Sequence, residues 1–178
     1  SSIIHLKFPR KDGKGDIRLT WMDGGLVPER PEELLPDEPL GDSAGGIIFE
    51  GTKGKMMGNY ATKPVLLPTK RMQEVTLPQT RLPRVPEGHY VQWVNACMKG
   101  YGNTTTSSPF DYAGPLTEAV LMGNLALRSY QMRTKNKQGY FTYPGRKKLL
   151  WDAKNMRITN FEEANQFVKR EYRKGWSL

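Results

Sequence analysis

The chain has 178 residues, which suffices for one domain with a single sizeable core, and its apolar content is modest at 37% with a mean hydropathy of −0.64. Its single cysteine excludes an intramolecular disulfide, and with only two histidines beside it we expect no structural metal. No apolar run reaches the roughly 18 residues of a membrane span, so we expect a soluble protein, and the net charge of +9 raises the question of nucleic acid.

Two strands are predicted at the start of the chain. Residues 3–8 alternate between apolar and polar side chains, and the turn at 11–15 leads into a second strand at 17–21. The segment 27–42 then carries four prolines and six acids, which excludes an internal strand and disfavours a long helix. We expect this segment to be a surface excursion.

The stretch "GGIIFEGTKGKMMGNY" at residues 45–60 suggests either a phosphate-binding loop or a tight turn between strands. A P-loop would need glycine at position 49 and Ser or Thr at 56, where the chain has Phe49 and Met56. The dinucleotide fingerprint G-x-G-x-x-G occurs nowhere in the chain. The glycines therefore favour a hairpin of two strands, 47–50 and 55–57.

Prolines between residues 64 and 86 allow at most short edge strands, and a first helix is predicted at 87–99. Gly100 stands where a helix commonly ends. One amphipathic stripe, at positions i, i+3, i+4 and i+7, is formed by Tyr90, Trp93, Val94 and Cys97. We expect Cys97 to be a thiol in the core. His89 is either a surface residue, the reading we favour, or a ligand contact.

A second helix is predicted at 110–128, with Ser108 as its N-cap. Residues 116–127 are apolar nearly all round, which indicates a central buried helix. Glu118 and Asn124 are its polar exceptions. They either point into a site or line a narrow wet face, and the second reading is the commoner.

A third helix is predicted at 161–172, with Asn160 as N-cap and Glu163 three positions later, and residues 147–159 supply one or two more strands. Helices that follow paired strands predict an α+β fold, with a largely antiparallel sheet and helices packed on one face. The other sheet face would then be open, and we expect a dimer or higher oligomer through it.

The segment 128–148 holds four lysines, three arginines and no acid. Four aromatic residues interleave with these charges: Tyr130, Tyr140, Phe141 and Tyr143. Such a mixture is found on surfaces that bind single-stranded nucleic acid. It is found more often in a solvated loop whose tyrosines cover the edge of a core, which is the reading we favour.

The motif "TWMDGG" ends the second strand with Trp21 and Asp23. An aromatic platform beside a carboxylate acceptor suits a sugar, although a packed Trp with a turn-capping Asp is the commoner arrangement. Rigid aromatics and an Arg fork near the ends of elements suit a polyol. The predicted substrate-binding residues are Trp21, Asp23, Tyr60, Arg71 and Tyr112.

Four ordered blocks resemble a known family: "LTWMDGGLVPERPEEL", "GGIIFEGTKGKMMGNYATKPVLLPTKRM", "FDYAGPLTEAVLMGNLALR" and "KKLLWDAKNMRITNFEEANQFVKREYRKGWSL". Together they resemble the C-terminal domain of the Gfo/Idh/MocA family, the relatives of glucose-fructose oxidoreductase and inositol dehydrogenase. The resemblance covers nearly all of 19–178, with 131–144 looking like an insertion. It implies an N-terminal Rossmann domain that binds NAD or NADP, and a C-terminal α+β domain that holds the sugar and mediates oligomerisation.

The resemblance also implies what we do not expect in this chain. The family's Glu-Lys-Pro motif and its Asp and His pair would precede residue 1, and the chain opens without Met, which suggests a piece of a longer protein. We therefore expect residues 1–178 to be one substrate-binding and oligomerisation domain, with no catalytic, cofactor or metal residues, and inactive alone. Its partners would be the parent's Rossmann domain, a sugar or polyol and further copies of the chain. The compartment stays open between bacterial cytoplasm and periplasm.

Two other classes remain open. A nucleic-acid-binding module would use 128–148 and would lose affinity steeply with salt. A stand-alone carbohydrate-binding module would use Trp21, Tyr60 and Tyr112, and would bind sugar without any dinucleotide.

Overall fold

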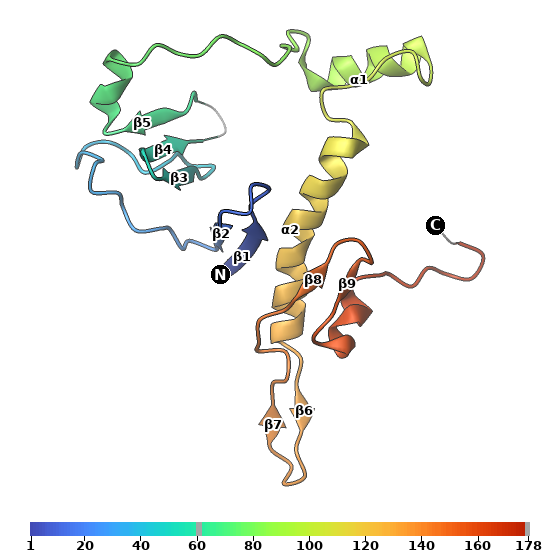
Figure 1. Ribbon diagram of the computed structural model, residues 1–178. Coiled ribbons are helices and arrows are strands. Elements are labelled where there is room, and N and C mark those ends of the chain that lie inside the picture. The colour runs from blue at the N-terminus through green and yellow to red at the C-terminus, as the bar shows by residue number, and fades with distance from the viewer. Residues whose placement is uncertain (60–61, 177–178) are drawn as a thin grey trace. The chain divides into compact units, whose positions relative to one another are not determined.

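Small antiparallel sheets and two α-helices make up an α+β fold in the computed structural model, which describes residues 1–59 and 62–176 (Figure 1). In chain order the elements are β1 (Ser2–Pro9), β2 (Asp16–Asp23), β3 (Ile47–Gly51), β4 (Gly54–Gly58), β5 (Val65–Leu67), the 3-10 helix η1 (Thr69–Gln73), α1 (Gly88–Lys99), α2 (Phe110–Tyr130), β6 (Thr134–Lys135), β7 (Phe141–Thr142), β8 (Trp151–Asp152), β9 (Arg157–Ile158) and the 3-10 helix η2 (Glu162–Phe167).

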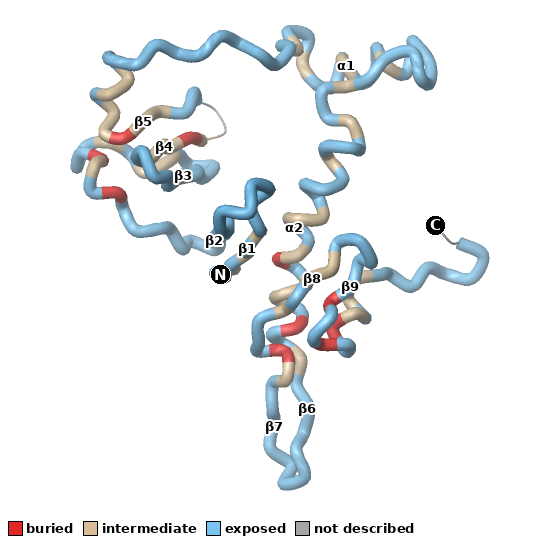
Figure 2. The backbone as a smooth tube through the Cα atoms, in the orientation of Figure 1, coloured by how far each residue is buried: buried red, intermediate tan, exposed pale blue. Residues whose placement is uncertain are grey.

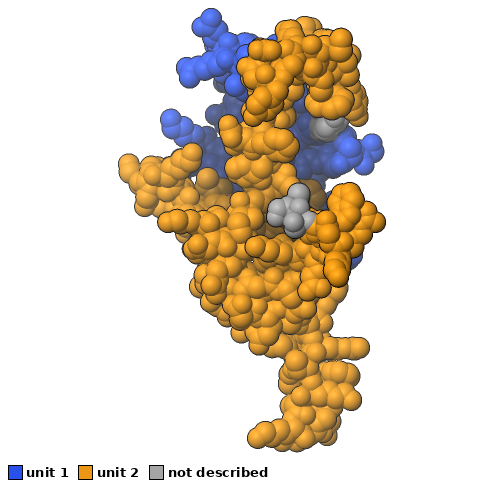
Figure 3. All heavy atoms as spheres, turned by 90° about the vertical axis from the view of Figure 1, so that its right-hand side faces the viewer, with its two compact units in different colours: residues 1, 22–84 blue, residues 2–21, 85–178 orange. Residues whose placement is uncertain are grey.

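These elements gather into two compact units, coloured separately in Figure 3. Unit 1 contains residues 1 and 22–84, and unit 2 contains residues 2–21 and 85–178. Each unit has its own secondary structure and its own buried residues, which Figure 2 marks in red. That the two units belong to one domain stays a prediction.

The expectation of one antiparallel sheet with helices on one face is wrong. The described strands form four separate sheets, β1–β2, β3–β4–β5, β6–β7 and β8–β9. Irregular, proline-containing segments at 27–42 and 74–87 lie before and after the β3–β4–β5 sheet in the chain, and they contribute no strand that could join it to another hairpin. The two predicted N-terminal hairpins are confirmed, as are the short strands within 147–159.

Unit 1 is built on the sheet β3–β4–β5. Its central strand β4 pairs antiparallel with β3 on one side and with β5 on the other. Leu67 of β5 is 1% exposed, and Leu34 from the proline-rich excursion is also buried. The excursion is therefore anchored to unit 1 by a leucine, although most of its residues are exposed as expected.

Unit 2 packs β1 and η2 against α2. The residues of β1 alternate between half-buried and exposed, as the sequence predicts for a strand with one covered face. Gly123 allows this approach, because a Cβ added there would lie 3.2 Å from Cδ1 of Ile4. Near the C-terminal end of α2, a core cluster consists of Ile158, Phe161 and Ala164, with Leu125, Met132, Leu149, Trp151 and Phe167 packed against it.

The predicted helix at 161–172 is wrong, because η2 is a short 3-10 helix that ends at Phe167. Asn160 does not cap it: its side chain donates to the carbonyl of Lys148 at 2.8 Å and accepts from the amide of Leu150 at 2.8 Å. Asn165 likewise bonds both the amide and the carbonyl of Ile158. These amides tie the segment to β8 and β9, in competition with helix propagation.

Two expectations about helix burial are also wrong. Helix α1 has no buried residue, its predicted apolar stripe is exposed, and Cys97 is an exposed thiol. In α2 only Gly123 and Ser129 are buried, whereas Leu116, Val120 and Leu121 are half or more exposed. Amphipathicity predicts which face of a helix would pack, and the described chain leaves much of these faces uncovered.

We predict that Ile158→Ala lowers the free energy of unfolding by about 3 kcal/mol, since it empties a site that is 1% exposed in the core cluster. The matched control is Leu121→Ala, which removes a half-exposed side chain from α2 and is expected to cost about 0.5 kcal/mol or less. Urea denaturation followed by far-UV circular dichroism measures both. Equal effects of the two substitutions would contradict the position of this core.

Candidate functional site

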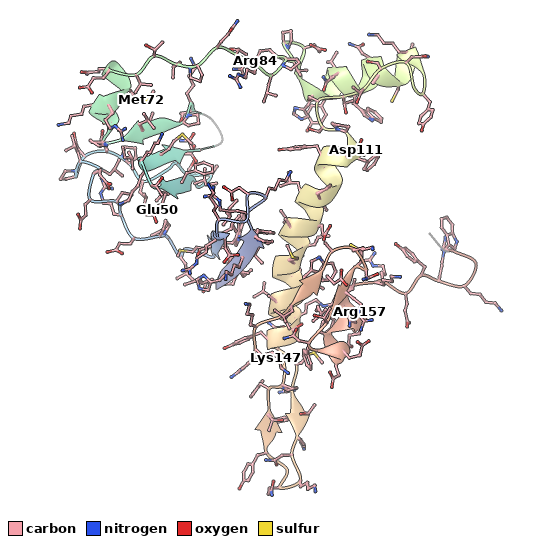
Figure 4. All side chains as sticks on the ribbon, in the orientation of Figure 1. Glu50, Met72, Arg84, Asp111, Lys147 and Arg157 are labelled. Atoms are coloured by element: carbon pink, nitrogen blue, oxygen red, sulfur yellow. The ribbon has the colours of Figure 1, made fainter. Side chains whose placement is uncertain are left out.

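A shallow open depression of about 320 Å³ lies on unit 1, between the β3–β4–β5 sheet and η1. Two strands, their connecting turn and one arginine from η1 contribute most of its wall. Its lining residues are Phe49, Glu50, Gly51, Lys53, Gly54, Lys55, Met56, Leu66 and Arg71. Figure 4 labels Glu50 on β3 and Met72 on η1, the two elements between which the depression lies.

The register of the sheet produces an apolar row in this depression. Phe49 of β3 lies opposite Met56 of β4, and Met56 lies opposite Leu66 of β5. Directly opposed residues share a sheet face, so these three side chains form one continuous strip across three strands. The next pair, Glu50 with Lys55, lies on the other face. The row thus supplies an apolar floor with charged groups at its margin.

Arg71 reaches this site because η1 follows β5 directly and turns back along the sheet. Its Nη1 donates to the carbonyl of Leu67 at 3.3 Å. The same nitrogen would lie 2.8 Å from a Cβ added at Gly54, whose φ is +127°. Glycine is therefore favoured at this turn for two reasons. It adopts the positive φ without strain, and it leaves the space that the guanidinium occupies.

An ion pair sets the charge of the depression. Lys55 Nζ donates to Glu33 Oε2 at 2.9 Å, and about a third of each side chain is exposed. This hydrogen bond lowers the pKa of Glu33 and raises the pKa of Lys55. Because Glu33 compensates Lys55, the remaining charges in the lining are two cations, Lys53 and Arg71, and one carboxylate, Glu50.

Of the five predicted substrate residues, Arg71 lines the depression. Asp23 ends β2 and belongs to unit 1, but it is not among the lining residues. Trp21 and Tyr112 belong to unit 2, where they are 55% and 62% exposed, and Tyr60 lies outside the described residues. A single site built from all five stays a prediction.

The sequence reasoning missed the floor of the depression. The predicted hairpin already implies that Phe49 lies opposite Met56, because the turn at 51–54 sets the register of its two strands. Leu66 carried no comparable signal, because β5 has three residues and lies among prolines.

The two polar exceptions in the apolar stretch of α2 are accounted for: one is hydrogen-bonded within the fold and the other is exposed to solvent. Glu118 accepts a hydrogen bond from Trp151 Nε1 at 2.6 Å, which fixes the β8–β9 hairpin to α2, while Asn124 is exposed. Within residues 1–59 and 62–176 no group of three or more His, Cys, Asp or Glu side chains could hold a metal ion. None of the helices in this part of the chain has the length and hydropathy to cross a bilayer.

The described residues do not fit a dinucleotide. A pyrophosphate site of the Rossmann kind needs a strand, a glycine-rich turn and a helix whose N-terminus faces the phosphates. The glycine-rich turn at 51–54 leads into the antiparallel strand β4 and not into a helix. We therefore derive no chemical step through NAD or NADP for these residues.

The basic segment contains a short hairpin. Strands β6 and β7 pair through Thr134 and Thr142, and the Asn136 side chain accepts from the amides of Gln138 and Tyr140 to close the turn. The chain's own cations stack on the nearby rings: Arg133 over Phe141 at 4.7 Å, and Arg146 over Tyr143 at 3.7 Å and over Tyr130 at 4.7 Å. One face of each of these rings is thus occupied.

Comparison with known proteins gives no match: no family model matches the chain, and neither does any curated protein. The geometry alone defines the class of the site, a shallow apolar floor with cations at its rim.

We predict that Glu33→Gln destabilises the protein at pH 7 by removing the ion pair with Lys55. The pKa of Glu33 is lowered from 4.5 in the folded state, so the contribution of its charge is present above that value and is lost as the pH falls through the lower folded-state pKa. Urea denaturation between neutral and acid pH measures the difference between wild type and variant. The same substitution at the exposed Glu29 is the control. A difference that persists in strong acid would contradict the assignment.

Proposed function

We propose that this chain is the substrate-binding and oligomerisation domain of a NAD(P)-dependent sugar or polyol oxidoreductase. In this proposal a separate Rossmann domain of the parent protein holds the dinucleotide and the acid–base residues. The chain positions the sugar and joins copies of the enzyme, and it has no redox activity alone. The ordered sequence blocks that resemble the Gfo/Idh/MocA C-terminal domain support this assignment.

The observation that carries the proposal is the depression on unit 1, with Arg71 beside the row of Phe49, Met56 and Leu66. Sugars present an apolar face of C–H groups and a rim of hydroxyls. The first suits an apolar floor, and the second needs oriented hydrogen-bonding groups, for which Arg71 is available in the lining.

Oligomerisation is supported by an uncovered apolar strip on β2. His5 Nδ1 and Thr20 Oγ1 lie 3.1 Å apart, so these two side chains share one face of the β1–β2 hairpin. Alternation places Ile17, Leu19 and Trp21 on the opposite face, the one on which Ile4 meets α2, and there they remain 58%, 40% and 55% exposed. A strip of this kind on a paired strand favours burial by association.

A nucleic-acid-binding module is the second candidate. It is favoured by the seven cations and absence of acids in residues 128–148, and by Tyr140, which is 72% exposed on the β6–β7 hairpin. The cation–π contacts weigh against it, because a ring already covered by Arg on one face offers less surface for a base. Affinity for single-stranded DNA that falls steeply with salt would favour this candidate.

We predict that the isolated chain shows no saturable binding of NADH or NADPH, because the described residues lack a pyrophosphate cradle. Titration followed by nicotinamide fluorescence is the direct measurement, with a Rossmann-domain dehydrogenase as positive control. Saturable micromolar binding, or turnover of any sugar, would refute the proposal. A reading frame in the parent gene that encodes G-x-G-x-x-G and Glu-Lys-Pro ahead of this chain would support it.

We also predict that Leu19→Glu shifts the protein to a smaller species in sedimentation velocity, since it places a charge in the apolar strip of β2. The control is Thr20→Glu, which adds the same charge to the other face of the same strand. Circular dichroism checks that both variants fold. If the wild type sediments as a monomer at micromolar concentration, the oligomerisation part of the proposal is wrong.

A further inference from the structure

The charge of the depression distinguishes among the sugars it could accept. Glu33 compensates Lys55, and Glu50 lies opposite Lys55 on the other face of the sheet, so Lys53 and Arg71 are the cations that remain in the lining. Among the described residues, neither cation has an acidic partner on the face of the apolar row. A neutral sugar would leave these cations without a counterpart, whereas a ligand with a carboxylate would supply one.

Arg71 has hydrogen-bonding capacity to offer such a ligand. Within the described residues its guanidinium makes one side-chain hydrogen bond, from Nη1 to the carbonyl of Leu67. The remaining N–H groups of the planar fork can donate in parallel to two carboxylate oxygens. The side chain is half-buried, which restricts its rotamers and raises the strength of a charge-assisted bond relative to bulk water.

The shape of the lining favours a carboxylate carried by a sugar ring over a simple phosphate. The turn at 51–54 does not lead into a helix, so it lacks the arrangement of amides that holds phosphate in a P-loop. The row of Phe49, Met56 and Leu66 instead offers an apolar strip that can face the C–H side of a pyranose. In a uronic acid the carboxyl group lies at the edge of the ring, so both contacts can form together.

We propose that the depression binds a uronic acid, with the ring against Phe49, Met56 and Leu66 and the carboxylate on Arg71. This inference rests on the proposed role of the depression as the sugar site, and it names the substrate class. Gly54 is a positioning residue for this contact, because a Cβ there would lie 2.8 Å from Arg71 Nη1 and would displace the guanidinium.

The test is isothermal titration of the full chain with glucuronate, glucose and glucose 6-phosphate. We expect glucuronate to bind about tenfold more tightly than glucose, the preference that one charge-assisted contact supplies. Arg71→Met is expected to abolish this preference while leaving glucose binding within about twofold, since the floor is unchanged. The matched control is Lys70→Met, which removes one charge from the neighbouring exposed position of η1 and should keep the preference.

A second variant, Gly54→Ala, tests the positioning role, and its expected result is loss of the glucuronate preference with Arg71 still present. Thermal denaturation identifies a variant that fails to fold, in which case Arg71→Met decides.

Equal binding of glucose and glucuronate would overturn the inference and leave the proposed function standing. Equal binding of glucose 6-phosphate and glucuronate would overturn it in favour of a general anion site. Binding of none of the three would overturn both the inference and the sugar-site proposal.

Discussion

The pairing of β4 with two neighbours is the constraint on which the rest of unit 1 depends. Because β4 is the only described strand that pairs on both edges, its register with β3 and β5 sets which side chains share a face. The apolar row follows from that register. So does the position of Lys55 on the opposite face, where Glu33 of the proline-rich excursion meets it. A slip of one residue would exchange the two faces and remove both features.

A second consequence of that sheet concerns its charged side chains. Some are paired within unit 1, whereas Arg71 stays available to a ligand. Lys55 is tied to Glu33, and Glu38 from the same excursion accepts a hydrogen bond from Thr69 of η1. These contacts lower the pKa of both glutamates. The acidic residues of the excursion therefore anchor it to the sheet and η1. Arg71, two residues along η1 from Thr69, keeps most of its guanidinium for the depression.

Unit 2 follows a different principle, in which much apolar surface stays uncovered. Its core is a small cluster around Ile158, Phe161 and Ala164, held in place by amide side chains that bond backbone groups. By contrast, β2, α1 and long stretches of α2 expose large apolar residues. Surfaces of this kind favour association, which supports the proposed oligomerisation.

The features that the sequence by itself determines are local ones. The hairpins β1–β2 and β3–β4, and the helices α1 and α2, follow from alternation, turn glycines and helical periodicity, each of which acts over a few residues. Arg71 could be singled out from its residue type and its place near an element end. The same local signals predicted a helix at 161–172, where η2 forms instead.

Only the tertiary structure decides what each face meets. Asn160 bonds the backbone of Lys148 and Leu150, just before β8, and these partners lie more than ten residues before the predicted helix at 161–172. The exposure of Cys97 likewise depends on whether another segment covers α1. In the depression, Leu66 and Arg71 join Phe49 through the pairing of β5 and the turn into η1. Periodicity specifies which side of an element is apolar, whereas burial and proximity depend on contacts between residues distant in the chain, and those form only when the chain folds.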